Sequence, residues 1–348
     1  MKNKPFKAID FFCGAGGMTT GFKKAGVSVT AGIDIDFNCK DTYETNHPES
    51  KFIHADIKKL TFNEFERETK IRKKDDKMIF IGCSPCQYFS TIRTKKAKSE
   101  ESRNLLTDFQ RFVKEYTPGY VVIENVPGIL TSKESPLNNF INFLKNNHYA
   151  IEYKLIRMEE FGIPQSRKRF LLLASRVSKY ITLPKETYSP HNTVSDYIHP
   201  NLGFPKLKAG AKDFSEKLHT VANLSDTNLK RLSLTEKNGG DRLAYVNNKK
   251  LAIPSQFKNS KNFKDTYGRM KWDAPAPTIT TKFFSVSNGR FAHPEQNRAI
   301  SLREGAILQT FEHEYIFKGK SIQSIARQIG NAVPPKMAYA IAKQIVNS

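Results

Sequence analysis

Cys86 has the sequence context of a nucleophile. It lies in the segment GCSPCQYFS, residues 82–90, directly after an apolar run at 78–82 that predicts a buried strand. The carboxyl ends of parallel strands are where α/β enzymes place reactive groups, and Pro85 fixes how the thiol is presented. A small buried thiol is the more common fate of a free cysteine, but the position and the Pro-Cys-Gln context favour a nucleophile. Cys83 lies nearer the strand, and we interpret it as packing.

Glu124 and a pair of arginines also adjoin predicted strands. Glu124 follows the apolar run 120–123 and could act as a general acid beside Cys86, although a helix cap or a salt bridge is equally open from this segment alone. Arg167 and Arg169 lead into the apolar run 170–174, where alternation would put both guanidinium groups on one face. Such a pair suits a phosphate or a base carbonyl, whereas a solvated edge is the default interpretation of a charge run.

A glycine-rich turn at 13–17 follows a predicted strand at 7–12 and precedes a predicted helix. Gly14, Gly16 and Gly17 would let the backbone pass close to a ligand beside free helix N–H groups, or would serve packing only. Asp34 stands 20 positions beyond Gly14 at the end of the second predicted strand, a spacing that suits ribose hydroxyls. Asp36 could do the same.

Two more positions are candidates for a cofactor pocket on weaker grounds. Asp56 could accept the exocyclic amine of an adenine, but a surface-loop aspartate is the more common interpretation. Asn331, in the segment QIGNAVPP before the last predicted helix, could complete the pocket or simply begin that helix.

These residues require a scaffold of alternating strands and helices. Apolar runs predict strands at 7–12, 27–35, 78–82, 120–124 and 170–174. Helical patterns lie at 17–25, after the second strand as far as residue 43, at 104–116 and at 137–148, and an amphipathic helix is predicted at 336–346. This order predicts a doubly wound, mostly parallel α/β sheet. We expect residues 1–183 and 301–348 to form this domain and residues 184–300 to form a second, smaller one.

Charge indicates a polyanionic partner. Lys and Arg exceed Asp and Glu by 22 in the 348 residues, which favours nucleic acid, although a Lys-rich proteome would also make a chain basic. Residues 177–270, with 16 Lys and Arg against 8 Asp and Glu, read as an irregular basic module.

There is neither a transmembrane run nor a signal peptide, so we expect a cytoplasmic protein. Four cysteines form no disulfide framework, and without a second Cys or His pair we expect no zinc site. A redox pair of Cys83 and Cys86 is conceivable.

The sequence resembles the cytosine-5 DNA methyltransferase family, in six motifs that occur in the family's own order. They are DFFCGAGGMTTGF (10–22), GCSPCQYFS (82–90), ENVPGIL (124–130), FGIPQSRKRF (161–170), APTITT (276–281) and RQIGNAVPP (327–335). The resemblance spans nearly the whole chain except about 180–270. It implies the fold of S-adenosylmethionine-dependent methyltransferases, with a target-recognition domain at 184–300.

The resemblance also implies roles for individual residues. Cys86 matches the nucleophile, Glu124 the acid, and Arg167 and Arg169 the paired arginines. The residues that match the S-adenosylmethionine site are Phe12, Gly14, Gly16, Gly17, Asp34, Ile35, Asp56, Ile57, Pro85, Asn331 and Val333. Two positions depart from the usual family pattern: Asp34 stands where many members carry Glu, and Ile35 where the neighbour is often aromatic. Stacking on the adenine is accordingly expected to be weaker.

The family's chemistry explains these residue types. Cytosine C5 is too poor a nucleophile to take a methyl group unaided, so a thiolate adds at C6 and makes C5 electron-rich. The carboxyl at 124 assists at N3, and Arg169 stabilises charge near O2. The cytosine must leave the duplex to be reached. The charged segment 91–103 matches a loop that closes over DNA in the family, although it could be an ordinary solvated loop.

For DNA contacts we expect Gln87, Ser90 and Arg103 near the nucleophile, and Arg242 and Arg269 in the basic module, with the turn 238–241 beside Arg242. The expected partner is double-stranded DNA, with a restriction endonuclease acting separately in a bacterial restriction–modification system. We expect a monomer without a metal.

Other classes explain less of the sequence. Amino-methylating DNA enzymes need an Asp/Asn/Ser-Pro-Pro-aromatic motif, whereas the one Pro-Pro pair here stands between Val333 and Lys336. A tRNA-methylating branch of the family shares most motifs, and only the basic module favours DNA over it. A catalytically silent DNA-binding relative would not need Cys86 and Glu124, and a dehydrogenase would leave five motifs unexplained.

Overall fold

The structure, a computed structural model, describes residues 5–84, 104–186, 192–213, 215, 217–253 and 265–348. It divides into two units, of which the first contains residues 1–161, 168–187 and 333–348 and the second residues 162–167 and 188–332. Each unit is described by itself.

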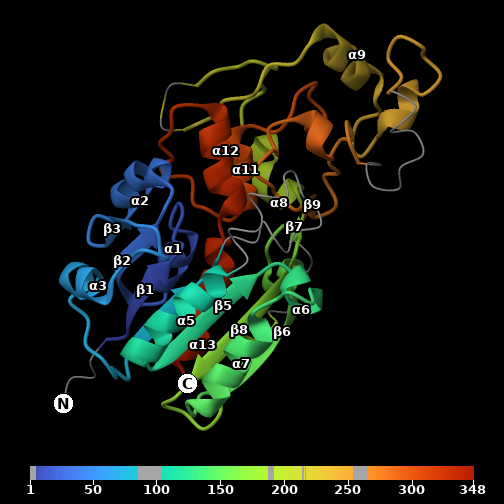
Figure 1. The fold of residues 1–348 in the computed structure, drawn as a ribbon. Coiled ribbons are helices and arrows are strands. Elements are labelled where there is room, and N and C mark those ends of the chain that lie inside the picture. The colour runs from blue at the N-terminus through green and yellow to red at the C-terminus, as the bar shows by residue number, and fades with distance from the viewer. Residues whose placement is uncertain (1–4, 85–103, 187–191, 214, 216, 254–264) are drawn as a thin grey trace. The chain divides into compact units, whose positions relative to one another are not determined.

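The first unit is built on a seven-stranded sheet with the strand order β3-β2-β1-β4-β5-β8-β6 (Figure 1). Neighbours among the first five strands in this order pair in parallel, and β8 pairs antiparallel with both β5 and β6. The sheet is therefore mostly parallel, as predicted. Its strands are β1 (Lys7–Phe11), β2 (Ser28–Asp34), β3 (Lys51–His54), β4 (Met78–Gly82), β5 (Tyr120–Asn125), β6 (Ala150–Arg157) and β8 (Lys168–Ser175).

Helices cover the sheet, and their apolar faces form its core. The helices of this unit are α1 (Gly17–Lys24), α2 (Lys40–Asn46), α3 (Phe62–Thr69), α5 (Leu105–Tyr116), α6 (Gly128–Thr131), α7 (Leu137–Asn146) and α13 (Pro335–Val346), with short 3-10 helices η1 (Phe37–Cys39) and η2 (Met158–Phe161). Phe11 of β1 lies 5.6 Å from the ring of Phe65 in α3 and 5.1 Å from that of Phe109 in α5. These rings join α3 and α5, with α7, to one face of the sheet, where Figure 1 shows α5 and α7 in front of it.

The last helix, α13, packs closely on the first. A Cβ added to Gly21 of α1 would lie 2.4 Å from Cβ of Ala338 and 2.5 Å from the carbonyl oxygen of Pro335. No larger residue fits there, since real Cβ atoms do not approach so closely. The two ends of the chain thus close one unit.

The second unit has little regular structure and is held by buried polar groups. Its elements are β7 (Gln165–Ser166), β9 (Ala276–Pro277), α8 (Ser195–Ile198), α9 (Asp226–Leu234), α11 (Leu302–Leu308), α12 (Ile322–Asn331), η3 (Pro200–Leu202), η4 (Arg242–Tyr245) and η6 (Val286–Asn288). Arg298 donates to both carboxylate oxygens of buried Glu304, at 2.7 and 2.8 Å. Burial alone would raise the pKa of Glu304, but the Arg298 charge and hydrogen bonds lower it to about 2.

The sequence predicted five of these strands and the helices α1, α2, α5, α7 and α13, but it predicted neither α3 nor α12, nor every boundary. Residues 301–332, expected in the larger domain, belong to the second unit. Polar contacts explain this division, because Gln309 donates to the carbonyls of Ile329 and Ala332, and Arg303 to that of Lys217. A division at 184 and 301 stays a prediction for the limits of the target-recognition domain.

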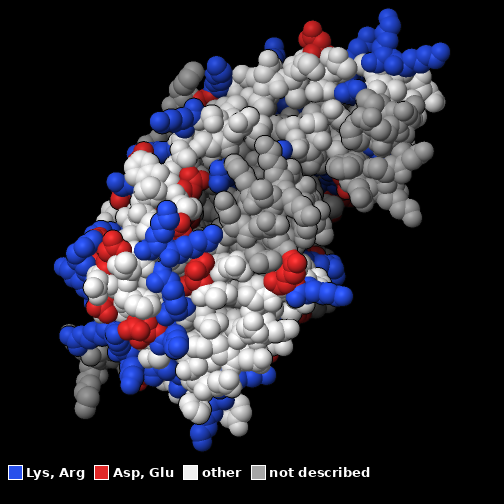
Figure 2. Space-filling model, in the orientation of Figure 1, with Lys and Arg blue, Asp and Glu red and all other residues white. Residues whose placement is uncertain are grey.

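Basic side chains are spread over both units. Figure 2 shows Lys and Arg gathered over the region of α3, interspersed with acidic groups, and again near α9. In the part of the chain that the structure describes, no helix is both long and apolar enough to cross a membrane.

Candidate functional site

Glu124 and Arg169 meet at the carboxyl end of β5. Glu124 is 7% exposed, and its Oε1 lies 3.0 Å from Nε of Arg169, at the start of antiparallel β8. This is an ion-pair distance without hydrogen-bond alignment, because Oε1 is buried with no hydrogen-bond partner. The carboxyl group therefore keeps an unused hydrogen-bonding oxygen, which is the property that a proton donor or acceptor for a substrate requires.

The adjacent strand β4 leads into the proposed nucleophile segment. Cys83, directly after β4, lies close to Glu124, and burial followed by the Glu124 charge raises the pKa of its thiol well above the usual value. This shift disfavours the thiolate of Cys83, and our interpretation of Cys83 as packing stays a prediction. The remaining predicted residues of this segment lie outside the described residues, namely Pro85, Cys86, Gln87, Ser90 and Arg103.

Asn125 is a site residue that the sequence reasoning missed. It is 1% exposed, and its Nδ2 donates to the hydroxyl of Ser84 at 3.1 Å and to the carbonyl oxygen of Ser84 at 3.3 Å. Its own Oδ1 accepts from the backbone N–H of Val126. The amide thus fixes the residue that immediately precedes Pro85 and Cys86. The motif ENV contained the signal, but we assigned a role only to its glutamate.

The two arginines are not placed as alternation along one strand predicts. The extended segment is interrupted at Arg167, between β7 and β8, so the argument from a shared strand face was wrong. Arg167 is buried and donates to the carbonyls of Ile279 and Ala332 in the second unit, at 3.2 and 3.4 Å. Arg169 is the one of the pair for which the structure shows an ion pair with Glu124.

The glycine-rich turn after β1 is built around Asp34. The backbone N–H of Gly14 donates to Oδ2 of Asp34, and the N–H of Asp36 donates to Oδ1, both at 2.8 Å. Phe12 and Gly14 have positive φ angles of 63° and 50°, a region that is uncommon for a non-glycine residue such as Phe12. Asp34 therefore shapes this turn, in addition to the ribose role that the sequence predicts for it.

The turn leaves two surfaces suited to a nucleoside-containing cofactor. Helix α1 begins at Gly17 with neither a side-chain cap nor an acidic residue in its first turn, so its N-terminus favours a ligand carboxylate. Ile35, directly after Asp34, is 63% exposed and offers an apolar surface. Both observations fit the residue set predicted for S-adenosylmethionine.

Beneath the turn lies a buried carboxyl group that we did not anticipate. Asp10 of β1 is fully buried and accepts a hydrogen bond of 2.7 Å from the hydroxyl of Thr19 in α1, while its Oδ1 has no partner. Burial raises the pKa of Asp10 to about 7, although the hydrogen bonds from Thr19 oppose the shift. A neutral Asp10 at moderately acidic pH follows from this burial.

The other predicted cofactor and DNA residues are scattered. Asp56 and Ile57 form the turn after β3, where Oδ1 of Asp56 accepts from the N–H of Lys58 at 3.0 Å. Asn331 is the last residue of α12, not the beginning of a helix. Val333 is buried, and Arg242 is half-buried on η4.

The burial of Arg269 contradicts our expectation that this residue contacts DNA. It is 1% exposed, and its guanidinium donates to protein acceptors on several segments of the second unit. They are the carbonyl oxygens of Leu232, Thr235, His293 and Gln296, and the side chain of Asn297. A guanidinium enclosed in this way cannot reach a base, so Arg269 holds the unit together.

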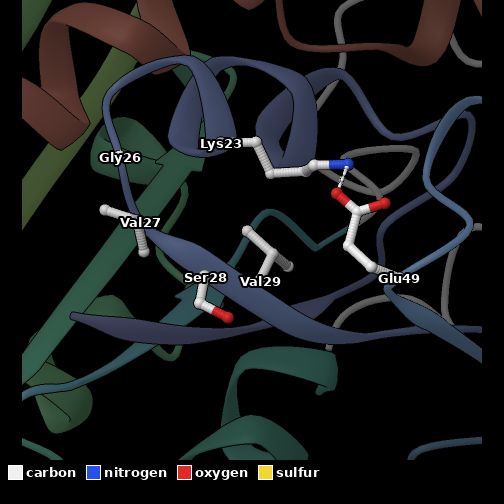
Figure 3. A pocket seen from close by; sticks show the side chains of 6 residues that line it. All are labelled: Lys23, Gly26, Val27, Ser28, Val29 and Glu49. Atoms are coloured by element: carbon white, nitrogen blue, oxygen red, sulfur yellow. Dashed lines mark ion pairs between the residues drawn. The ribbon is translucent and has the colours of Figure 1, made fainter. Parts of the chain in front are cut away.

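One hollow of the first unit lies away from these residues. It has a volume of about 270 Å³ and is lined by Lys23, Gly26, Val27, Ser28, Val29 and Glu49. Figure 3 shows Lys23 paired with Glu49 across it. Because β2 begins at Ser28, this hollow is at the opposite end of the strand from Asp34. Among the described residues, no group of three or more His, Cys, Asp or Glu could hold a metal ion.

Comparisons with known proteins give a consistent family assignment. The model of the C-5 cytosine-specific DNA methylase family matches residues 6–347. Type II methylase M.HgiDII of Herpetosiphon aurantiacus is 37% identical, with 97% of this chain and 94% of that protein covered. Type II methyltransferase M1.HphI of Haemophilus parahaemolyticus is 33% identical, covering 97% and 86%.

A solved structure supports the fold. A prophage-encoded Escherichia coli protein described as a DNA modification methyltransferase superposes with a TM-score of 0.74 at 23% identity, covering 98% of this chain and 99% of the other.

Proposed function

Because the chain belongs to the C-5 cytosine-specific DNA methylase family, we propose that it methylates a cytosine of a specific duplex DNA sequence through a covalent adduct with Cys86. DNA cytosine-5 methyltransferase is the activity of this family. The observation that supports the mechanism is the buried Glu124–Arg169 pair at the end of β5. It adjoins the end of β4, from which the chain continues through Ser84 to Cys86.

In the proposed reaction the Cys86 thiolate adds to C6 of an extruded cytosine. The new S–C6 bond moves the C5–C6 π electrons onto C5, while Glu124 donates a hydrogen bond or proton at N3. Arg169 stabilises the negative charge that develops towards O2. The methyl group that C5 takes up would come from the sulfonium of the bound cofactor, whose S–CH3 bond would break to leave S-adenosylhomocysteine. The C5 proton then passes to solvent, and departure of the Cys86 thiolate restores the ring.

The cofactor is S-adenosylmethionine, which supplies an electrophilic methyl group on a sulfonium when bound. We assign its carboxylate to the uncapped N-terminus of α1 beside Gly16 and Gly17, and its ribose to Asp34. Ile35, Asp56 and Ile57 face the adenine in this assignment. The remaining residues assigned to the cofactor are Phe12, Gly14, Pro85, Asn331 and Val333. The scheme uses no metal ion.

We further propose that the enzyme is the protective methylase of a bacterial restriction–modification system. Its relatives M.HgiDII and M1.HphI are type II enzymes by name, and the excess of 22 basic residues suits duplex DNA. We retain four of the predicted DNA contacts, namely Gln87, Ser90, Arg103 and Arg242. In this proposal the protein acts as a cytoplasmic monomer, and a separate endonuclease cuts unmethylated DNA.

Methylation mapping tests the activity and the substrate together. The purified protein is incubated with duplex DNA, or with tRNA, and S-adenosylmethionine, and converted cytosines are read by bisulfite sequencing. We expect protection at one cytosine of a short DNA sequence and none in tRNA. Methylation confined to tRNA would contradict the DNA assignment.

A covalent trap tests the mechanism. In the presence of S-adenosylmethionine, 5-fluorocytosine in the mapped duplex sequence can take up the methyl group but then has no C5 proton to lose. The adduct should therefore persist, and mass spectrometry should find the base on Cys86. Cys86→Ser should give neither adduct nor product but should still bind S-adenosylmethionine. A variant with the wild-type rate would refute Cys86 as the nucleophile.

A further inference from the structure

Arg111 connects helix α5 to the turn that follows β3. Its Nη2 donates to the carbonyl oxygens of Ile57 and Leu60, both at 2.5 Å. The same turn closes on itself, because the N–H groups of Lys59 and Leu60 donate to the carbonyl of Asp56 at 2.9 Å. One guanidinium thus ties the backbone of this turn to α5, beside the core contacts that the side chains of Ile57 and Leu60 make.

The surroundings of Arg111 hold its guanidinium in place. Its Cζ lies 4.3 Å from the ring centre of Phe112 and 5.4 Å from that of Phe62, both distances within cation–π range. Asp108, one turn earlier on α5, has a buried Oδ2 with no hydrogen-bond partner. Burial raises the pKa of Asp108, and the negative charge of Asp56 raises it further. The positive charges of Lys58 and Arg111 oppose this shift. Charged groups of α5 and of the turn therefore face one another.

We propose that Arg111 is a positioning residue for the cofactor's adenine, acting through the 56–60 turn. The inference rests on the proposed function, in which Asp56 accepts the exocyclic amine and Ile57 packs on the purine. Oδ1 of Asp56 already accepts from the N–H of Lys58, so Oδ2 is the oxygen assigned to the amine. The direction of Oδ2 depends on the backbone of the turn, and Arg111 holds two carbonyls of that backbone.

Positioning of this kind has a kinetic signature. The adenine lies far from the methyl group that reacts, so a displaced turn weakens cofactor binding without changing the chemical step. Hydrogen bonds from a charged donor contribute about 1.5–3 kcal/mol, which corresponds to about a 10- to 150-fold change in affinity. A role confined to stability would lower the melting temperature and leave KM unchanged.

The test compares Arg111→Met and Arg111→Lys with Lys114→Met, which removes an exposed charge from the same helix. We expect Arg111→Met to raise KM for S-adenosylmethionine and Kd for S-adenosylhomocysteine at least about tenfold. Its kcat at saturating cofactor and its DNA affinity should stay within about twofold of wild type. Arg111→Lys should recover part of the affinity, and Lys114→Met should behave as wild type.

The outcomes separate this inference from the function on which it rests. Unchanged KM in both Arg111 variants, or equal losses in cofactor and DNA binding, would overturn the positioning role. If Arg111→Met does not fold, Arg111→Lys decides alone, with a raised KM at unchanged kcat as the expected result. Failure of the wild-type protein to bind S-adenosylhomocysteine would instead refute the proposed function.

Discussion

The amide of Asn125 donates to both the hydroxyl and the carbonyl oxygen of Ser84, at 3.1 and 3.3 Å. Asn125 is the last residue of β5, Ser84 stands two residues beyond the end of the neighbouring parallel strand β4, and the proposed nucleophile stands two positions beyond Ser84. The link therefore couples the position of β5, with the proposed general acid Glu124, to the segment that carries the proposed nucleophile.

Removing this link should slow the chemistry more than it weakens cofactor binding. Asn125→Ala leaves the Ser84 groups without their buried donor, at a cost of about 1–3 kcal/mol, or about 5- to 150-fold in kcat. Single-turnover methylation measures this loss. Ser84→Ala, which keeps the carbonyl contact, serves as the milder comparison. A wild-type rate in Asn125→Ala would show that the segment positions itself.

Glu124→Gln should separate proton donation from geometry. The amide keeps the size of the side chain but cannot donate a carboxyl proton at N3, and loss of a general acid slows catalysis by about 10²- to 10⁴-fold. The substitution also removes the partner of Arg169. Yield of the fluorocytosine adduct at fixed time measures the attack step. Equal adduct formation by wild type and Glu124→Gln would exclude a role in that step.

Asp10 should make stability depend on pH. Its pKa is raised from 3.8 to about 7 in the folded protein, so the native state binds the extra proton between these values, and this group's contribution falls as pH rises through that interval. A shift of about three pH units corresponds to about 4 kcal/mol at most. Asp10→Asn cannot ionise and should be more stable than wild type at pH 8.

Urea unfolding at pH 5 and pH 8 measures this effect. The advantage of Asp10→Asn should shrink at pH 5, where most of the wild-type carboxyl is protonated. Thr19→Val, which removes the hydrogen bond to Asp10, should destabilise wild type most at pH 8. A difference between wild type and Asp10→Asn that does not change with pH would contradict the raised pKa.

The sequence predicts the scaffold well where the signal is local. Buried parallel strands are continuous apolar runs, so β1, β4 and β5 were evident. In contrast, β3 has four residues, and β6 is partly exposed, so neither gives a clear run. Both were missed for that reason.

Site contacts were harder to predict because they join residues far apart in the sequence. Asn125 and Ser84 are 41 positions apart, and Arg111 and Ile57 are 54 apart. Patterns identify strand ends and therefore identified Glu124. They contain no information on which side chain of one segment reaches the backbone of another.

Arg269 should be essential for the second unit's stability and not for base recognition. Composition suggested a DNA contact, yet its guanidinium is buried among carbonyl oxygens. Arg269→Met leaves these acceptors without donors, at about 1–3 kcal/mol for each one that water does not reach. Unfolding should therefore begin at a lower temperature.

Arg242→Ala is the matched comparison, because that half-buried arginine is a proposed phosphate or base contact. It should leave the melting temperature unchanged while weakening DNA binding and lowering its salt dependence. An Arg269→Met protein with wild-type stability and reduced DNA affinity would restore the contact role that its burial argues against.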